Sequence, residues 1–198
     1  YSDIGVDAAK TGMLFSAAIM ETVCAFVERH PTPLVVDPVL VASSGAPLIQ
    51  PAAAAPLIER LLPLAAVVTP NLPEACALVG EPYNDNADRR RLAETIQGFG
   101  PAAVLITGGH GTDAVDWLFD GERHVQIPVE RLPARATHGA GCTHSAAITA
   151  LLARGESLEA AARQAAAVAI EAVRNGRSGL GQGEGPVDVI GLAARRSG

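Results

Sequence analysis

Residues 66–79 read AVVTPNLPEACALV, and this stretch decides the fold. Its first four residues form an apolar run that is typical of a buried strand, and a turn with two prolines follows. A short alanine-rich helix is then predicted over residues 73–79. The same order of strand, turn and helix recurs on both sides of this stretch. Strands that alternate with helices are typical of βαβ units, so the sequence predicts an α/β fold with a mostly parallel sheet.

The alternation continues in both directions along the chain. Further strands are predicted at residues 11–14, 34–36 and 103–107, and further helices at residues 16–29, 52–62, 87–99, 142–153 and 158–174. Ser16, Asp85 and Ser157 are predicted N-caps, because a side-chain oxygen at the start of a helix can accept a hydrogen bond from a first-turn amide. The chain shows no internal repeat and no linker, which indicates one domain over residues 1–198.

One segment departs from the parallel pattern. Residues 114–119 and 123–127 flank Asp120-Gly121, a dipeptide that suits the positive φ of a tight hairpin turn. We therefore expect an antiparallel hairpin late in an otherwise parallel sheet.

Composition excludes several classes of protein. The 198 residues are 48% hydrophobic and 18% charged, which rules out an intrinsically disordered chain. Prolines and a Ser-Ser-Gly turn interrupt the long apolar stretch at residues 34–55, so it does not suit a membrane helix. A net charge of −6 argues against nucleic acid as a partner. Three cysteines without a C-x-x-C pair favour a reducing compartment, and we expect a cytoplasmic protein.

Polar residues follow several of the predicted strands, where ligands of open parallel sheets bind. Asp37 comes directly after one strand, although a carboxylate there is also common in an ordinary turn. Asn71 and Glu74 follow the next strand and could hold a hydrated Mg²⁺. The alternative for Glu74 is simple stabilisation of its helix N-terminus. At residues 107–110, paired glycines allow backbone amides to approach a ligand, while His110 alone is more typical of a loop.

Residues 137–147, THGAGCTHSAA, are the most informative part of the sequence. Small residues open an alanine-rich helix, so its unpaired first-turn amides can bind an anion such as phosphate. Cys142 lies in that first turn, where the helix dipole favours the thiolate and suits a base or a nucleophile. A hydrolase dyad of Cys142 with His144 is disfavoured because residues two apart on a helix do not face each other, which leaves His138 as a candidate partner.

Four segments, in this order, carry a resemblance to a known family. They read VDPV at residues 36–39, TPNLPEA at 69–75, TGGH at 107–110 and THGAGCTHSAA at 137–147. Together they resemble the hydroxymethylpyrimidine/phosphomethylpyrimidine kinases, the thiamine-biosynthesis members of the ribokinase superfamily. The resemblance extends from Ser2 to Val187. It implies a ribokinase-like three-layer α/β/α sandwich, a homodimer, and a chain that begins after the family's opening strands and so exposes a sheet edge.

The resemblance also implies an activity and a set of site residues. The expected reaction is ATP-dependent, Mg²⁺-assisted phosphorylation of 4-amino-5-hydroxymethyl-2-methylpyrimidine and then of its monophosphate. Cys142 would accept the proton of the attacking hydroxyl, and Gly139, Ala140 and Gly141, with the Cys142 amide, would form the anion hole. The other implied site residues are Glu74 and Asp37 for the metal, Asn71, Thr107 and Gly109 for the nucleotide, and Met13 and Val39 for the pyrimidine.

Two positions depart from the family pattern, and two other functions stay open. Ala140 replaces a common Thr of the anion-hole motif, and Thr107 stands where some members carry a phosphate-binding Lys. The nearest alternative function is a pyridoxal kinase, because related enzymes accept both ring alcohols. A non-catalytic vitamin sensor is the alternative of another class, but it would have no reason to keep both an anion hole and a base.

Overall fold

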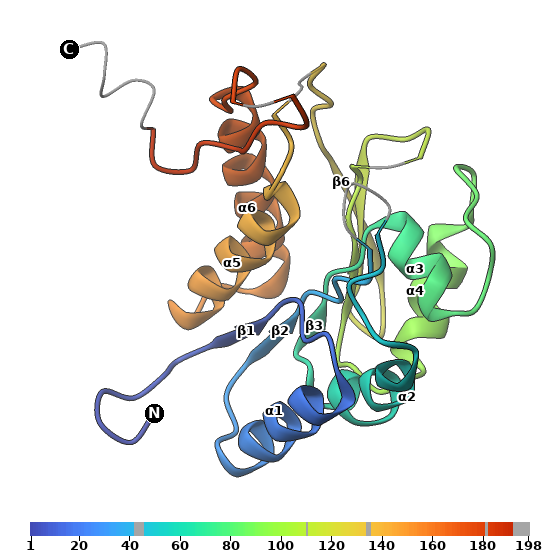
Figure 1. Cartoon of the computed structure of the whole chain (residues 1–198), viewed down its shortest axis with the longest axis vertical. Coiled ribbons are helices and arrows are strands. Elements are labelled where there is room, and N and C mark those ends of the chain that lie inside the picture. The colour runs from blue at the N-terminus through green and yellow to red at the C-terminus, as the bar shows by residue number, and fades with distance from the viewer. Residues whose placement is uncertain (42–45, 110, 134–135, 181, 192–198) are drawn as a thin grey trace.

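The computed structural model describes residues 1–41, 46–109, 111–133, 136–180 and 182–191 (Figure 1). In this part of the chain six strands form one sheet in the order β1 to β6. Their bounds are β1 Ala9–Thr11, β2 Leu34–Val36, β3 Val67–Val68, β4 Val104–Ile106, β5 Val115–Phe119 and β6 His124–Pro128. The first four strands are parallel, whereas β5 runs antiparallel to both β4 and β6. The prediction of a mostly parallel sheet with a late hairpin is confirmed.

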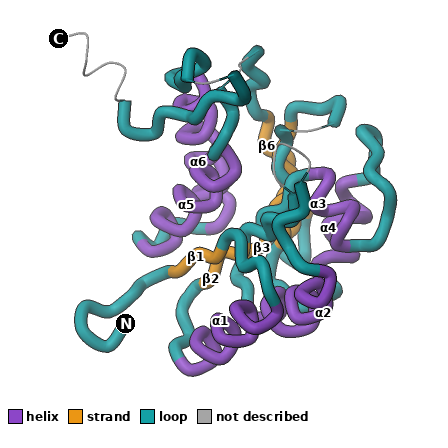
Figure 2. Tube along the Cα trace, viewed as in Figure 1, coloured by secondary structure: helices purple, strands orange, loops and turns teal. Residues whose placement is uncertain are grey.

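Helices cover both faces of this sheet, as Figures 1 and 2 show. Their bounds are α1 Ala17–Arg29, α2 Ala54–Pro56, α3 Leu72–Leu78, α4 Arg89–Gln97, α5 Ala140–Ala153 and α6 Leu158–Arg174. Helices α5 and α6 pack on one face, and α1 to α4 pack on the other. These are the three layers that the family resemblance implies. Within the described residues, no helix is long and apolar enough to cross a membrane.

The two faces of the sheet bury alternate side chains of the same strands. Val35, Val67 and Leu105 pack in the core beneath α5 and α6. Their neighbours Val36 and Val68 pack in the core on the opposite face of the sheet. This follows from the two-residue period of a strand, which points successive side chains to opposite faces. Because both faces are covered, the central strands are continuous apolar runs, and this made them easy to predict.

Some predicted boundaries were wrong. The first strand was predicted at residues 11–14 but ends at Thr11, since the chain then turns through Phe15, whose φ of 55° lies in the left-handed region. Asp88, not Asp85, caps α4, because its side chain accepts hydrogen bonds from the Arg90 and Arg91 amides. The predicted caps Ser16 and Ser157 are confirmed.

The helix predicted at residues 52–62 is not one regular helix. Short 3₁₀, α and π segments follow one another from Pro51 to Leu64. Pro56 and Pro63 fall inside this run, and a proline cannot donate the backbone hydrogen bond that a continuous helix requires.

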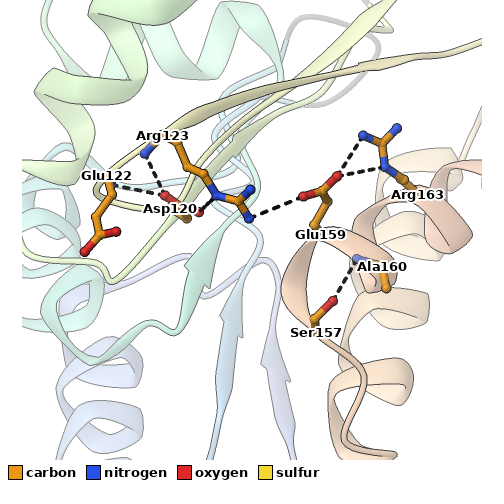
Figure 3. Close-up of polar contacts among 7 residues, drawn as sticks. All are labelled: Asp120, Glu122, Arg123, Ser157, Glu159, Ala160 and Arg163. Carbon is orange, nitrogen blue, oxygen red and sulfur yellow. Dashed lines mark hydrogen bonds and ion pairs between the residues drawn. The ribbon is translucent and has the colours of Figure 1, made fainter.

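A polar network joins the β5–β6 hairpin to α6 (Figure 3). Asp120 accepts hydrogen bonds from the amides of Glu122 and Arg123, and Gly121 has the positive φ that the turn requires. The Arg123 guanidinium also reaches Glu159 in the first turn of α6, at 3.4 Å. The tip of the hairpin is therefore tied to the helix layer beside it.

Candidate active site

The predicted ligand-binding segments meet at the carboxyl edge of the parallel strands. The backbone of Asn71, after β3, pairs with that of Thr107, after β4, and the Thr107 amide donates to the Pro70 carbonyl at 2.9 Å. Asp37 follows β2 at the same edge, and α5 begins close by, since Ser145 on that helix hydrogen-bonds to Asp37. The fold thus brings together four segments that lie far apart in the sequence.

Asn71 and Glu74 form a reciprocal helix cap. The Asn71 side chain accepts a hydrogen bond from the Glu74 amide, and the Glu74 carboxylate accepts one from the Asn71 amide, each at 2.9 Å. The capping interpretation of Glu74 is therefore confirmed. Burial, together with the negative charge of Asp37, raises the pKa of Glu74 to about 7, although hydrogen bonds from the Asn71 and Leu40 backbone act in the opposite direction.

Asp37 is buried and is held from two sides. Lys10 on β1 lies 3.2 Å from its Oδ2 atom, and the Ser145 hydroxyl on α5 donates to the same oxygen at 2.9 Å. Sequence reasoning missed both partners. The one available signal was that Lys10 is the only lysine of the chain.

The carboxylate pair fits a magnesium ion that keeps most of its water. Asp37 and Glu74 repel each other electrostatically, which a nearby divalent cation would relieve. Both also carry hydrogen bonds already, and the described residues contain no cluster of three or more His, Cys, Asp or Glu side chains around a common point. Mg²⁺ suits such a site, because it commonly binds through one or two carboxylates, waters and substrate phosphates.

The N-terminus of α5 is open. Gly139 precedes the helix with a φ of 90° and provides no side-chain cap. The Ala140 amide already donates to the Thr137 carbonyl at 3.0 Å, so it is not free in this structure for the anion hole predicted there. A Cβ atom placed on Gly141 would meet nothing within 4 Å, which leaves room for an anion beside the first turn.

Cys142 is exposed in this open turn, whereas Cys24 and Cys76 are buried. His144, two residues further along α5, is buried. The two side chains point in different directions, as the helix geometry predicts. His138 is exposed, and its backbone pairs with Pro186 and Val187 near the end of the chain.

The remaining predicted residues are placed as follows. Val39 lines a small pocket beside Asp37 that also includes Gly12, while Met13 is 54% exposed and is not among the lining residues. Gly109 has open space around it, since an added Cβ would meet nothing within 4 Å. His110 lies outside the described residues.

A family model described as phosphomethylpyrimidine kinase matches residues 1–188 of this chain. The chain belongs to the phosphomethylpyrimidine kinase family. It is 45% identical over 187 residues to a hydroxymethylpyrimidine/phosphomethylpyrimidine kinase of Streptomyces coelicolor, an alignment that covers 94% of this chain and 69% of that protein. It is also 44% identical to a bifunctional thiamine biosynthesis protein of Geobacter sulfurreducens, covering 98% of this chain and 40% of that longer protein. The family and the kinase activity expected from the sequence motifs are confirmed.

Solved structures of related kinases share the fold. An ADP complex of Bacillus subtilis pyridoxal kinase superposes with a TM-score of 0.87 at 38% identity, covering 97% of this chain and 73% of that one. A phosphomethylpyrimidine kinase of Clostridium difficile superposes with a TM-score of 0.74 at 36% identity, covering 87% and 71%. Members of this family and pyridoxal kinases therefore have closely similar backbones, so the shape of the backbone does not distinguish their substrates.

Proposed function

We propose that this protein transfers the γ-phosphoryl group of ATP to the hydroxymethyl group of 4-amino-5-hydroxymethyl-2-methylpyrimidine, and then a second one to the resulting monophosphate. The observation that carries the proposal is the open N-terminus of α5, with the exposed thiol of Cys142 in its first turn. Such a turn offers amides to a transferring phosphoryl group and a base to the attacking hydroxyl at the same place. Membership of the phosphomethylpyrimidine kinase family supports the choice of the pyrimidine alcohol.

In the proposed mechanism, the Cys142 thiolate accepts the proton of the hydroxyl while the hydroxyl oxygen attacks the γ-phosphorus and ADP leaves. The amides of Gly139, Gly141 and Cys142 stabilise the charge on the transferring group. The Ala140 amide instead stabilises the turn by its hydrogen bond to the Thr137 carbonyl. Phosphoryl transfer depends mainly on positioning and charge stabilisation, so amides and a base are sufficient protein machinery.

The nucleotide and its metal would bind at the strand edge next to this turn. Thr107 and Gly109 line the phosphates, and the capping pair of Asn71 and Glu74, with Asp37, holds a largely hydrated Mg²⁺. The ion, when bound, neutralises charge on the phosphates. Val39, in the pocket beside Asp37, and Met13 contact the pyrimidine. The homodimer expected from the resemblance and the cytoplasmic location expected from the three cysteines remain predictions.

Turnover of three candidate substrates tests the proposal. Purified protein is incubated with Mg²⁺ and ATP, and with the hydroxymethylpyrimidine, its monophosphate or pyridoxal, and product formation is followed. We expect both pyrimidines to be phosphorylated. Conversion of the monophosphate to the diphosphate is decisive, because broad acceptance of ring alcohols does not explain phosphorylation of a phosphate.

A pyridoxal kinase is the second candidate, and the close superposition on the Bacillus subtilis enzyme is the observation that favours it. Turnover of pyridoxal with neither pyrimidine would establish this alternative. Turnover of none of the three, with nucleotide still bound, would instead favour the sensor.

A further inference from the structure

A buried carboxylate on β5 reaches the nucleotide segment, which we define as residues 107–109. Asp116 is 4% exposed, and its Oδ1 atom accepts a hydrogen bond from the Gly108 amide at 2.6 Å. An amide so bound cannot rotate freely toward or away from a ligand. The orientation of the peptide between Thr107 and Gly108 is thereby set by a side chain of the antiparallel hairpin.

Gly108 also lies unusually close to the hairpin backbone. A Cβ atom at this position would lie 2.6 Å from the carbonyl carbon and oxygen of Val115, which real structures do not tolerate. Glycine is therefore required here for close approach rather than for a positive φ. The short hydrogen bond and the close backbone contact together hold the nucleotide segment against the start of β5.

The other carboxylate oxygen of Asp116 faces α5, the helix that carries Cys142. His144 on α5 is buried, and its Nε2 atom lies 3.4 Å from Asp116 Oδ2, within ion-pair distance but outside hydrogen-bond geometry. Burial raises the pKa of Asp116 and lowers that of His144, and the charge of each group opposes the effect of burial on the other. The Ala162 backbone of α6 also acts against the effect of burial on the pKa of His144.

We propose that Asp116 is a positioning residue for the nucleotide. Its carboxylate orients the nucleotide segment, residues 107–109. His144, on the same helix as Cys142, keeps that carboxylate in place. The nucleotide segment and the first turn of α5 are thus linked through the buried side chain of Asp116. This inference rests on the proposed function only in that residues 107–109 line the phosphates of ATP.

The test separates nucleotide positioning from stability. In Asp116→Ala the Gly108 amide loses its acceptor, and we expect the KM for ATP and the Kd for the analogue AMP-PCP with Mg²⁺ to rise about tenfold. The KM for the pyrimidine is expected to stay within about twofold, because the pocket beside Val39 is not touched. Asp116→Asn keeps an acceptor oxygen and should restore most of the nucleotide affinity.

Asp120→Ala is the matched control. Asp120 is on the same hairpin and also accepts backbone amides, but at the far end from the nucleotide segment. This variant is expected to lower the melting temperature and to leave the KM for ATP unchanged. In the double variant Asp116→Ala/His144→Ala the KM for ATP should be no higher than in Asp116→Ala alone, because His144 acts through Asp116.

Unchanged nucleotide affinity in Asp116→Ala, or an equal loss in Asp120→Ala, would overturn the proposal. If the alanine variant does not fold, Asp116→Ser is used, whose side chain is too short to reach Gly108 and which should give the same rise. Failure of the wild-type protein to phosphorylate either pyrimidine would refute the proposed function instead. The AMP-PCP comparison does not depend on turnover and would still decide the role of Asp116.

Discussion

At the scale of single residues, Cys142 carries the chemistry of the proposed function. Cys142→Ala removes the base and keeps the backbone amides of the turn, so we expect kcat to fall by about 10²–10⁴-fold while nucleotide binding is retained. Steady-state kinetics and AMP-PCP titration measure the two effects separately. Cys142→Asp places a different base there and should retain part of the activity.

Cys76→Ala serves as the control for this substitution. Cys76 is 1% exposed on α3, packs in the core and is expected to affect stability but not kcat. An unchanged kcat in Cys142→Ala would contradict the assignment of Cys142 as the base.

Glu74 gives a prediction about pH. The pKa of its carboxyl is raised from 4.5 to about 7 in the folded protein. Its contribution to stability is therefore complete below about pH 4.5 and is lost as the pH rises toward about 7, since the unfolded chain ionises first. The full loss is on the order of 3 kcal/mol.

Glu74→Gln cannot ionise and still offers an acceptor to the Asn71 amide. We expect urea denaturation between pH 4.5 and pH 8 to show a smaller fall in stability for this variant than for the wild type. A constant offset between the two proteins is irrelevant, because only the slope with pH reports the titration. Equal slopes would show that Glu74 is not protonated at neutral pH.

At the scale of elements, the start of α5 allows two glycines to be compared. Gly139 has a φ of 90°, so Gly139→Ala should destabilise the protein by about 1 kcal/mol through backbone strain. Gly141 lies within the helix, with open space beside it, so Gly141→Ala should keep or raise stability because alanine favours the helix.

Activity should separate the same two variants in a different way. The added methyl group of Gly141→Ala occupies the space proposed for the transferring phosphoryl group, and we expect kcat to fall although the protein is at least as stable. Thermal melts and kinetics on both variants check this. A fully active Gly141→Ala would place the phosphoryl group elsewhere.

The elements also show why some parts of the fold could be predicted and others could not. Strands β2 to β4 are apolar runs that end at turns, so pattern alone located them. Strand β1 reads Ala-Lys-Thr, and the more apolar residues after it drew the prediction toward residues 11–14. Asp85 and Asp88 are equally good caps by residue type, and only the tertiary position of α4 selects the second.

At the scale of the whole molecule, the sheet is buried on both faces, and each helix layer packs against it. Ile148 of α5 is fully buried in the core on the α5 and α6 side. Ile148→Ala should therefore lower the free energy of unfolding by about 2–5 kcal/mol. Val168→Ala on α6 is the control, because Val168 is 42% exposed and its loss should have little effect. Urea denaturation measures both, and similar losses would contradict this packing.

The site, unlike the strands, depends on contacts that no local pattern reveals. Ser145 and Asp37 are 108 positions apart in the sequence, yet they share a hydrogen bond. Cys142, Asn71 and Glu74 were found because each follows a turn at a helix start. Lys10 and Asp116 were missed because their roles come from the folded arrangement of β1 and of the hairpin.

The contrast in exposure among the three cysteines has a practical consequence for the whole protein. A thiol reagent applied under native conditions should modify one sulfur atom per chain, and that atom is at the proposed reaction centre. The mass added by an alkylating probe then counts intact sites directly. A bound ligand should slow the alkylation, so the alkylation rate reports how much of the site is occupied without any turnover assay. The same accessibility should also expose Cys142 to peroxide, which oxidises a cysteine first to a sulfenic acid.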